Sequence, residues 1–339
     1  MPATEPDACR VDAVVIGRNE GARLIACLAS LQGQVGRIIY VDSGSTDGSI
    51  DAARAAGAEV IALDMAQPFS AARARNAGLK ALASDPPTLV QFIDGDCSLQ
   101  PGWLTRARPF MQKNPDIAVA CGRRRELFPA ASLYNLLCDW EWNTTPGEAT
   151  ACGGDALIRH DALAAIGGYR DDVIAAEDDE MCQRLRAAGF RIWRLDEEMT
   201  LHDAAITRLG QFWRRAVRAG HGFAQLGALH AGYFSAPRRR ALFWAALLPA
   251  AALVIGWVLS PFFGLLGAAA LYGASIIRTA MRLAHEGFAP GQALHASGLL
   301  MLSKFANLQG MALYHWRRLR GASATIIEYK TGARAGSAG

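Results

Sequence analysis

Residues 90–99 read VQFIDGDCSL, an apolar run of strand character that ends in two carboxylates separated by one glycine. Because side chains alternate along an extended chain, Asp94 and Asp96 point to the same side. Gly95 lets the backbone turn and a bulky ligand approach closely. Two hard oxygen donors in an open position suit Mg²⁺ or Mn²⁺ carried in with a diphosphate. Taken alone, a solvated Asp-Gly turn is the better interpretation, so the function of this stretch depends on the rest of the chain.

Segments of strand and helix character alternate along the first 95 residues. The predicted strands are Val11–Ile16, Arg37–Val41, Glu59–Leu63 and Leu89–Ile93. The predicted helices are Ala22–Leu31, Ser49–Ala56 and Ala71–Ala83. Such alternation predicts an α/β fold with a mostly parallel sheet flanked by helices, and a site at the carboxyl ends of the strands.

The turns that follow these strands lack the usual nucleotide fingerprints. No GxGxxG follows the first strand, and no GxxxxGK[ST] occurs anywhere, which argues against a dinucleotide site or a P-loop. Acidic turns instead follow the second strand, at Asp42, and the fourth, at Asp94. Carboxylates at these strand ends would bind ribose hydroxyls, base N–H groups or a metal.

After residue 115 the alternation becomes less regular. Further strands are predicted at Ile117–Cys121 and Ile192–Leu195. Glycine-marked turns at residues 152–159 and 167–172 are of the kind that brings backbone close to a ligand. The acidic run Glu177–Glu180 opens a predicted helix over Met181–Ala188. Acidic residues stabilise the first turn of any helix, but four in succession exceed that need.

The charges are distributed unevenly. Residues 1–203 contain 20 Lys and Arg against 29 Asp and Glu, whereas residues 204–339 contain 15 against 2. An acidic half followed by a basic half indicates two environments and argues against nucleic-acid binding. The seven cysteines show no CxxC pair and no zinc spacing, which predicts reduced thiols in a cytosolic compartment. Residues 1–10 show no secretory signal and are expected to be flexible.

Residues 241–277 contain 37 residues without a charge, between an arginine cluster at 238–240 and Arg278. A bilayer core needs about 20 apolar helical residues, so this segment is too long for one span and suits two short ones. Ser260-Pro261 is a natural turn. The flanking arginines favour a membrane hairpin with both ends in the cytoplasm. The alternative is a buried helical pair in a soluble protein.

Two further basic segments favour membrane association. Residues 208–240 contain seven arginines and no acid, and anionic lipids attract such segments by about 1 kcal/mol per charge. A helix over about 292–320 has apolar residues and a basic end, which is typical of a helix lying along the membrane interface. These segments predict a protein on the inner (cytoplasmic) membrane with its catalytic domain in the cytoplasm and membrane lipids as partners.

With its acidic turns in order, the chain resembles a family 2 glycosyltransferase with the GT-A fold, of the membrane-attached kind acting in exopolysaccharide or lipid-linked glycan synthesis. The similarity runs from about residue 12 to 225. It rests on the ordered motifs VVIGRNE, VDSGSTDGS, RARNAGL, FIDGD, GGDALIR with GGYRDD, and EDDE. The resemblance implies a GT-A domain over 11–235, membrane-associated helices over 236–322 and a tail over 323–339.

The resemblance also implies roles on the nucleotide side of the site. Asp42 reads the base, and Asp47 holds its loop. Arg75 lies near the base or the phosphates. The residues expected to line the nucleotide pocket after the first strand are Ile16, Arg18 and Glu20.

On the catalytic side, Asp94 binds ribose or the metal, and Asp96 binds the divalent ion that bridges the diphosphate. Gly154 and Asp155 contact the donor sugar or the acceptor. The residues expected at the base position and as a further metal ligand are Asp178, with Glu177 beside it as the alternative base, and His202.

The implied reaction is a metal-dependent single displacement at the anomeric carbon, which inverts its configuration. The implied partners are Mn²⁺ or Mg²⁺, a nucleoside-diphosphate sugar (by family habit a UDP-sugar) and a saccharide or polyprenyl-linked acceptor. Two alternatives are a nucleotidyltransferase of related fold and a non-catalytic membrane scaffold. The first usually carries a glycine-rich basic loop that is absent here, and the second would be expected to lose an acidic motif.

Overall fold

The structure is a computed structural model that describes residues 9–321 and 325–328. The chain divides into two units. The α/β unit contains residues up to 129 and 138–204, and the helical unit contains 130–137 and the residues from 205 onward. Most of the expected flexible N-terminus (1–10) and tail (323–339) lies outside the described residues.

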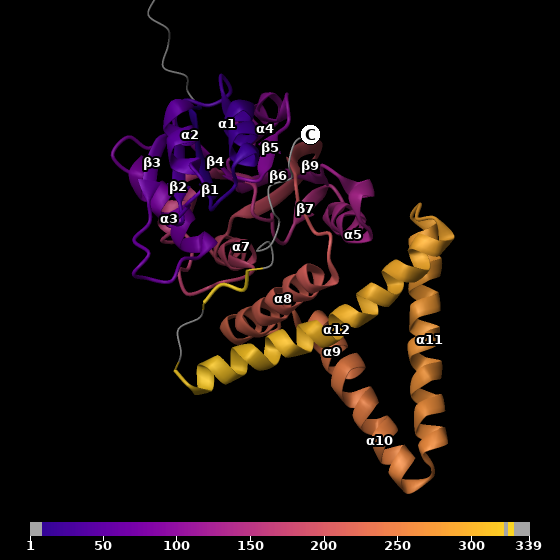
Figure 1. The fold of residues 1–339 in the computed structure, drawn as a ribbon. Helices are drawn as coiled ribbons and strands as arrows, with labels where there is room; N and C mark the ends of the chain where they lie inside the picture. Colours follow the sequence, from indigo (N-terminus) through magenta and orange to yellow (C-terminus); the bar gives the residue numbers. More distant parts are fainter. Residues whose placement is uncertain (1–8, 322–324, 329–339) are drawn as a thin grey trace, which may run out of the picture. The chain divides into compact units, whose positions relative to one another are not determined.

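A single mixed sheet forms the centre of the α/β unit (Figure 1). In the described residues its order is β3-β2-β1-β4-β8-β6-β9-β5, and β7 pairs with β9. The strands are β1 (Val11–Gly17), β2 (Ile38–Asp42), β3 (Glu59–Ala62), β4 (Leu89–Asp94), β5 (Cys97–Leu99), β6 (Ile117–Glu126), β7 (Gly147–Ala149), β8 (Ala156–Arg159) and β9 (Arg191–His202).

The first four strands are parallel, as the alternation of strands and helices predicts. Gly17 at the end of β1 lies opposite Asp42 of β2, and Ile16 lies opposite Asp94 of β4. The acidic turns after β2 and β4 therefore lie at the same edge of the sheet. β1 is buried along nearly its whole length, which is typical of a parallel strand covered on both faces.

Helices flank the sheet, and those at residues 22–31, 49–55, 71–82 and 177–187 lie close to their predicted positions. They are α1 (Ala22–Leu31), α2 (Ser49–Ala55), α3 (Ala71–Leu82), α4 (Trp103–Lys113), α6 (His160–Ala165) and α7 (Glu177–Ala187). α3 approaches β1 closely because of Gly78, where a Cβ atom would lie 2.4 Å from Val14 Cγ1. The predicted α/β fold with flanking helices is confirmed, with the parallel strands in the first half of a mixed sheet.

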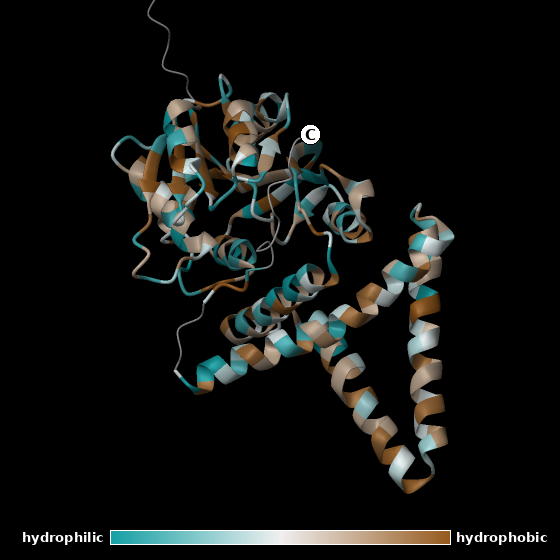
Figure 2. Ribbon diagram, viewed as in Figure 1, coloured by the Kyte–Doolittle hydropathy of each residue, from teal (hydrophilic) through white to brown (hydrophobic). Residues whose placement is uncertain are grey.

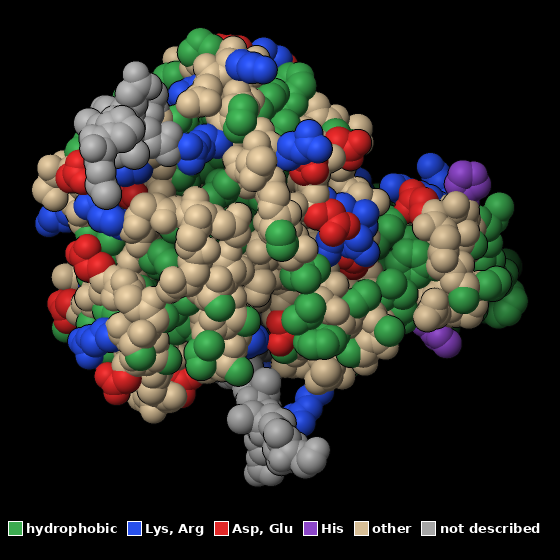
Figure 3. All heavy atoms as spheres, turned by 90° about the horizontal axis from the view of Figure 1, so that it is seen from above, with side chains coloured by type: hydrophobic (Ala, Val, Ile, Leu, Met, Phe, Trp, Pro, Cys, Tyr) green, Lys and Arg blue, Asp and Glu red, His purple; other side chains and the backbone are tan. Residues whose placement is uncertain are grey.

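The second half of the sheet is mixed. β8 lies antiparallel between β4 and β6, and β9 pairs with β6 in parallel and with β5 antiparallel. β6 extends five residues beyond the predicted end at Cys121, to Glu126. The arginine run 123–125 therefore belongs to a strand, and the Arg124 side chain is only 18 % exposed. On the face drawn in Figure 3, acidic and basic side chains lie interspersed.

The helical unit is built around a close crossing of two long helices. Its helices are the start of α5 (Leu133–Trp142), α8 (Leu209–Leu229), α9 (Ser235–Leu242), a π-helical turn at Phe243–Leu247, α10 (Leu248–Val258), α11 (Pro261–His285) and α12 (Pro290–Leu319). A Cβ atom at Gly220 of α8 would lie 2.1 Å from the backbone carbonyl oxygen of Asn307 in α12. We expected α8 in the catalytic domain up to residue 235, whereas this glycine contact packs it against α12.

The charge-free segment forms a helical hairpin whose turn is at Ser260-Pro261, as predicted. By length and composition, Ser235–Val258 and Pro261–His285 could each cross a membrane, and their apolar windows are only 11% and 6% buried. Hydrophobic residues run along α10 and α11 (Figure 2), and most of these residues are not covered by other parts of the described chain. This exposure contradicts a buried helical pair and is consistent with membrane association.

Candidate active site

The loop after β2 is held by the Asp42 carboxylate, which is 1% exposed. The backbone N–H groups of Gly44 and Ser45 donate to Asp42 Oδ2 at 2.9 and 2.8 Å, and the Tyr40 hydroxyl donates to Oδ1 at 2.9 Å. Asp47 holds the next turn, accepting from the Ser49 hydroxyl at 2.6 Å. Asp42 thus holds the loop after β2, a role that was expected of Asp47. Direct contact between Asp42 and the nucleotide base stays a prediction.

The loop after β1 joins the loop after β2 through Asn19. Its backbone N–H donates to Ser45 Oγ at 2.9 Å, and its Oδ1 accepts from the Thr46 N–H at 2.7 Å. Asn19 adopts a left-handed φ of 55°, which asparagine tolerates better than most residues. Sequence reasoning gave it no role, although its place in GRNE was a signal.

The residues predicted to line the nucleotide pocket lie around this loop. Ile16 is 8% exposed at the end of β1. The Arg18 guanidinium lies over the Phe69 ring, 4.8 Å from its centroid, and Glu20 pairs with Arg23 at 2.7 Å. The structure therefore brings these residues to the sheet edge that carries Asp42 and Asp94.

Arg75 of α3 joins three segments of the site and is only 2% exposed. Its guanidinium pairs with Asp94 Oδ1 at 2.8 Å and with Glu177 Oε1 at 2.6 Å, and it donates to the Gly154 carbonyl at 3.2 Å. Burial alone would lower the pKa of Arg75, but the two carboxylates outweigh it and raise the pKa. Arg75 therefore stays charged and fixes Asp94 relative to α7.

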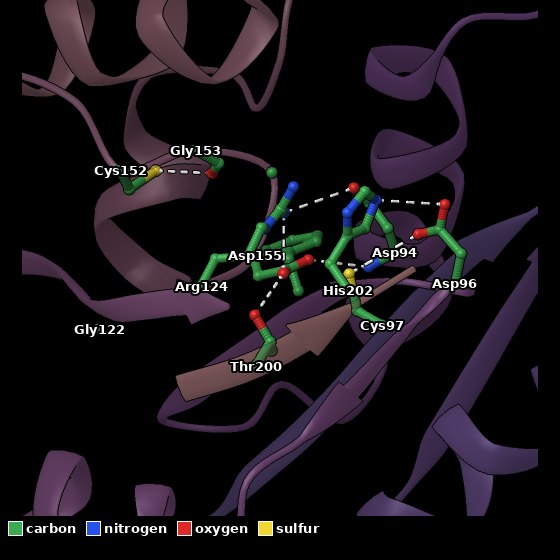
Figure 4. Close-up of polar contacts among 12 residues, drawn as sticks. Asp94, Asp96, Cys97, Gly122, Arg124, Cys152, Gly153, Asp155, Thr200 and His202 are labelled. Carbon is green, nitrogen blue, oxygen red and sulfur yellow. Dashed lines mark hydrogen bonds and ion pairs between the residues drawn. The ribbon is translucent and has the colours of Figure 1, made fainter. Parts of the chain in front are cut away.

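Asp155 positions Asp94 from the opposite side and is itself 1% exposed. Its Oδ1 accepts from the Asp94 N–H at 3.0 Å, and its Oδ2 accepts from the Thr200 hydroxyl at 2.8 Å. Arg124 Nη2 lies 2.8 Å from Oδ2 (Figure 4). The oxygens of Asp155 thus fix Asp94, Thr200 and Arg124 in place, and its expected contact with the donor sugar or the acceptor stays a prediction.

Residue 154 must be a glycine because two side chains approach its backbone closely. A Cβ atom there would lie 2.9 Å from both Arg75 Nη2 and Asp94 Oδ2. Any side chain would therefore push the arginine and the carboxylate apart.

Arg124 is a site residue that the sequence did not identify. Its Nη2 also lies 3.6 Å from Asp94 Oδ2, and its guanidinium lies 5.6 Å from the centroid of the Trp142 ring. The arginine run after Cys121 was the available signal, but only the extension of β6 brings Arg124 to the carboxylates.

Asp178 and Glu177, the two candidates for the base, have different surroundings. Glu177 is paired with Arg75, whereas no ion pair involves Asp178 among the described residues. Burial, and secondarily the charge of Glu177, raises the pKa of Asp178 to about 6. The preceding residue, Ala176, has a left-handed φ of 59°, a strained conformation that often occurs at functional sites. Of the two, Asp178 has the surroundings expected of a base, and the assignment stays a prediction.

Asp96 and His202 form a second cluster beside Asp94. His202 Nε2 lies 3.4 Å from Asp96 Oδ2, and Nδ1 lies 4.0 Å from Glu126 Oε2. The Trp142 ring packs against the imidazole at 4.8 Å. Burial and the charge of Arg124 lower the pKa of His202 to about 4, so the ring is neutral at pH 7.

This cluster fits a divalent cation. A neutral imidazole and a carboxylate are metal-ligand types, and the two atoms are close enough to share one ion. Asp94 is less suited as a ligand because both of its oxygens face arginines.

Comparison with known families matches two stretches of the chain. Glycosyl transferase family 2 matches residues 12–166, and Glycosyl transferase family 21 matches residues 143–316. The chain belongs to the family 2 glycosyltransferases. The first match contains the DxD-type carboxylates and Gly154, and the second contains α7, His202 and most of the helical unit.

Two curated relatives agree with this membership. The chain is 28% identical over 242 residues to a pre-mycofactocin glycosyltransferase of Mycobacterium tuberculosis, which covers 68% of this chain and 50% of the relative. It is 24% identical over 211 residues to the succinoglycan biosynthesis protein ExoA of Rhizobium meliloti, covering 58% of this chain and 64% of the relative. The family 2 glycosyltransferase described here thus spans about half to two-thirds of the length of these relatives.

A solved structure shows the same fold. The mannosyltransferase PcManGT from Pyrobaculum calidifontis, in complex with GDP-Man and Mn²⁺, superposes with a TM-score of 0.55 at 21% identity. The match covers 93% of this chain and 90% of that protein. The expected GT-A fold is confirmed.

Proposed function

We propose that this protein is an inverting glycosyltransferase that moves a sugar from a nucleoside-diphosphate sugar to a saccharide or lipid-linked acceptor. One observation carries the proposal. Arg75 joins Asp94, at the end of β4, to Glu177, at the start of α7, and thereby places the neighbouring Asp178, with its raised pKa, in the same site. Donor-binding and base carboxylates are thus brought together from distant parts of the sequence.

In this mechanism the acceptor hydroxyl attacks the anomeric carbon while Asp178 takes its proton. The bond to the nucleoside diphosphate breaks in the same step, so one displacement inverts the configuration. A base whose pKa lies near the working pH is efficient, because it is deprotonated yet still basic. Glu177 supports this role by occupying Arg75, which leaves Asp178 as the base.

The donor is proposed to lie along the carboxyl ends of β1, β2 and β4. Ile16, Arg18 and Glu20 line the nucleotide pocket, and Asp42 acts through the loop that it holds. The groups proposed to face the ribose, phosphates and sugar are Arg75, Asp94 and the Gly154 backbone, with Asp155 fixing Asp94.

Asp96 and His202 would hold a divalent ion, Mn²⁺ or Mg²⁺, which when bound neutralises charge on the leaving diphosphate. Their separation of 3.4 Å supports this assignment. Mn²⁺ in the PcManGT complex is in keeping with a metal in this fold.

We place the reaction at the cytoplasmic face of the inner membrane. The support is the pair of exposed apolar helices and the arginines that flank them. A polyprenyl-linked or growing saccharide acceptor would be presented at such a surface, and one curated relative is named for succinoglycan biosynthesis.

The first test is nucleotide binding by purified protein. UDP and GDP are each titrated with and without Mn²⁺ into wild type, Asp96→Ala and Asp178→Asn. We expect Mn²⁺-dependent binding of UDP, loss of the metal dependence in Asp96→Ala, and unchanged binding in Asp178→Asn. Preference for GDP would correct the proposed nucleotide, and failure of both nucleotides to bind would refute the transferase proposal.

A further inference from the structure

Cys97, directly after the second carboxylate of the DGD turn, takes no part in the proposed mechanism. In the antiparallel pairing of β5 with β9 it lies opposite His202. Directly opposed residues place their side chains on the same face, with Cβ atoms about 4.5–5.5 Å apart. The sheet therefore holds a thiol beside the imidazole that faces Asp96.

The three donors lie at the spacing of a small coordination site. Cys97 Sγ is 3.6 Å from Asp96 Oδ1, and His202 Nε2 is 3.4 Å from Asp96 Oδ2. One donor atom from each of the three residues lies within 4.8 Å of the others. In Figure 4 the three side chains gather at one point.

These separations agree with tetrahedral zinc. Zn–S bonds of about 2.3 Å and Zn–N or Zn–O bonds of about 2.0–2.1 Å give tetrahedral edges of roughly 3.3–3.6 Å. A small rotation of the Asp96 carboxylate would bring one oxygen toward both neighbours.

We propose that Asp96, Cys97 and His202 form a three-ligand site for Zn²⁺, with the Cys97 thiolate as the ligand that favours zinc over Mn²⁺ and Mg²⁺. Thiolates select softer ions, whereas carboxylates and water suit magnesium and manganese. Three protein ligands leave a fourth position for water or a ligand oxygen.

Glu126 supports the same geometry from behind the imidazole. Its Oε2 lies 4.0 Å from His202 Nδ1 and also accepts the Ala204 N–H at 3.0 Å. Metal-binding histidines commonly have a carboxylate near their second nitrogen, which fixes the ring orientation.

Zinc binding would follow the balance Zn²⁺ plus the Cys97 thiol giving a zinc thiolate and one proton, with no oxidant or reductant needed. Mn²⁺ and Zn²⁺ would compete for Asp96 and His202. Resting on the proposed function, this predicts that Zn²⁺ inhibits the Mn²⁺-supported transferase, and that replacing Cys97 relieves the inhibition.

A pair of buried thiols elsewhere in the α/β unit would compete with Cys97 for a thiophilic metal ion. Cys152 and Cys182 are buried with their sulfurs 3.5 Å apart. A thiophilic ion bound there would give the same kind of thiolate signal, so the experiment must separate the two places.

The test uses full-length, metal-stripped protein without nucleotide, titrated with Cd²⁺ as a spectroscopic substitute for zinc. Thiolate-to-metal charge transfer in the ultraviolet reports a cysteine ligand. We expect one equivalent of Cd²⁺ to produce this band in wild type and in Cys152→Ala, and not in Cys97→Ala. Absence of the band in wild type, or its loss in Cys152→Ala with retention in Cys97→Ala, would overturn the proposal.

Affinity gives a second measure. Because loss of a supporting outer residue already costs about 10–100-fold in metal affinity, Cys97→Ala should weaken Zn²⁺ binding by more than about 10-fold. Mn²⁺ binding, followed by its electron paramagnetic resonance signal, should be unchanged. Equal loss of both metals would indicate a structural role for Cys97.

X-ray absorption of zinc-loaded wild type removes dependence on any variant. We expect one sulfur at about 2.3 Å with nitrogen and oxygen ligands at about 2.0–2.1 Å. A shell of nitrogen and oxygen alone refutes the site. Because these readouts involve no sugar nucleotide, they stand or fall separately from the transferase proposal.

Discussion

Two tryptophans show how differently the two units are built. Trp103 of the α/β unit is 1% exposed, and its indole N–H donates to Gln91 at 2.9 Å. Trp257 of the helical unit is 89% exposed, among apolar neighbours that are also exposed. The first unit buries even charged groups in paired networks, whereas the second presents apolar surface that water disfavours. The contrast is consistent with a polar ligand in the first unit and with the membrane association that we propose for the second.

The largest expected effect concerns the base. Asp178→Asn should lower transfer by about 10²–10⁴-fold, because a general base contributes about that much. In wild type, kcat/KM should fall as the pH drops below about 6, since the Asp178 carboxylate is then protonated. A pH–rate profile checks this, with Asp179→Asn as the neighbouring control. Near wild-type turnover in Asp178→Asn would remove the base assignment.

The buried ion network gives the next effect. Arg75→Met should destabilise the protein by about 3–5 kcal/mol, because it leaves the buried Glu177 carboxylate without its partner and removes one of the two arginines beside Asp94. The matched control is Arg54→Met, whose pair with Asp51 is exposed and should matter by less than about 1 kcal/mol. Urea unfolding measures both. Similar losses for the two variants would contradict the contrast between buried and exposed charge.

The apolar surface of the hairpin can be tested with a charge. Leu253 is 76% exposed, so in water Leu253→Arg would change stability by no more than about 0.5 kcal/mol. In a bilayer it should cost about 2.5–3.5 kcal/mol of insertion free energy. Ile25→Arg, at a 55% exposed position of the α/β unit, is the control. Equal membrane-bound fractions of the two variants after alkaline extraction would argue against lipid contact.

The raised pKa of Asp178 also predicts a cost in stability. Its folded-state pKa of about 6 exceeds the ordinary 3.8, so the folded state is relatively destabilised above pH 6 and gains stability as the pH falls from 6 toward 4. At pH 7.5 the free energy of unfolding of Asp178→Asn should therefore exceed that of wild type by about 1–3 kcal/mol. The variant should accordingly unfold at a higher temperature. The difference should disappear near pH 4. A lower melting temperature at pH 7.5 would contradict the destabilised carboxylate.

The smallest effect compares two helix caps. Ser70 accepts the Arg73 N–H at the start of α3, and Ser260 accepts the Phe262 N–H at the start of α11. Ser70→Ala should cost about 1 kcal/mol and speed amide exchange in α3 and β4, while Ser260→Ala should leave that exchange unchanged. Hydrogen-exchange mass spectrometry separates the two units. A response of α3 to Ser260→Ala would show that the units unfold together.

Local patterns predicted much of the fold. α1 begins and ends at the predicted residues, the first four strands lie within a residue of prediction, and the hairpin turns at Ser260-Pro261. Strand alternation, glycine stops and a charge-free run are properties of neighbouring residues, so they are visible without tertiary structure. The predicted ends failed at β6 and also at β9, which continues to His202 instead of ending at Leu195, because both extensions depend on the pairing of these two distant strands.

By itself the sequence determined the α/β order, the acidic turns, the apolar hairpin and, through its motifs, the family. Only the tertiary structure decided which of these carboxylates pair with an arginine and which do not. Arg75 pairs with Glu177 and Asp94, whereas burial, and secondarily the charge of Glu177, raises the pKa of Asp178. Likewise, no spacing in the sequence indicated zinc, yet strand pairing places Cys97 opposite His202. A side chain's ionisation and its ligands depend on neighbours in space, and here those neighbours are about 100 residues apart in the chain.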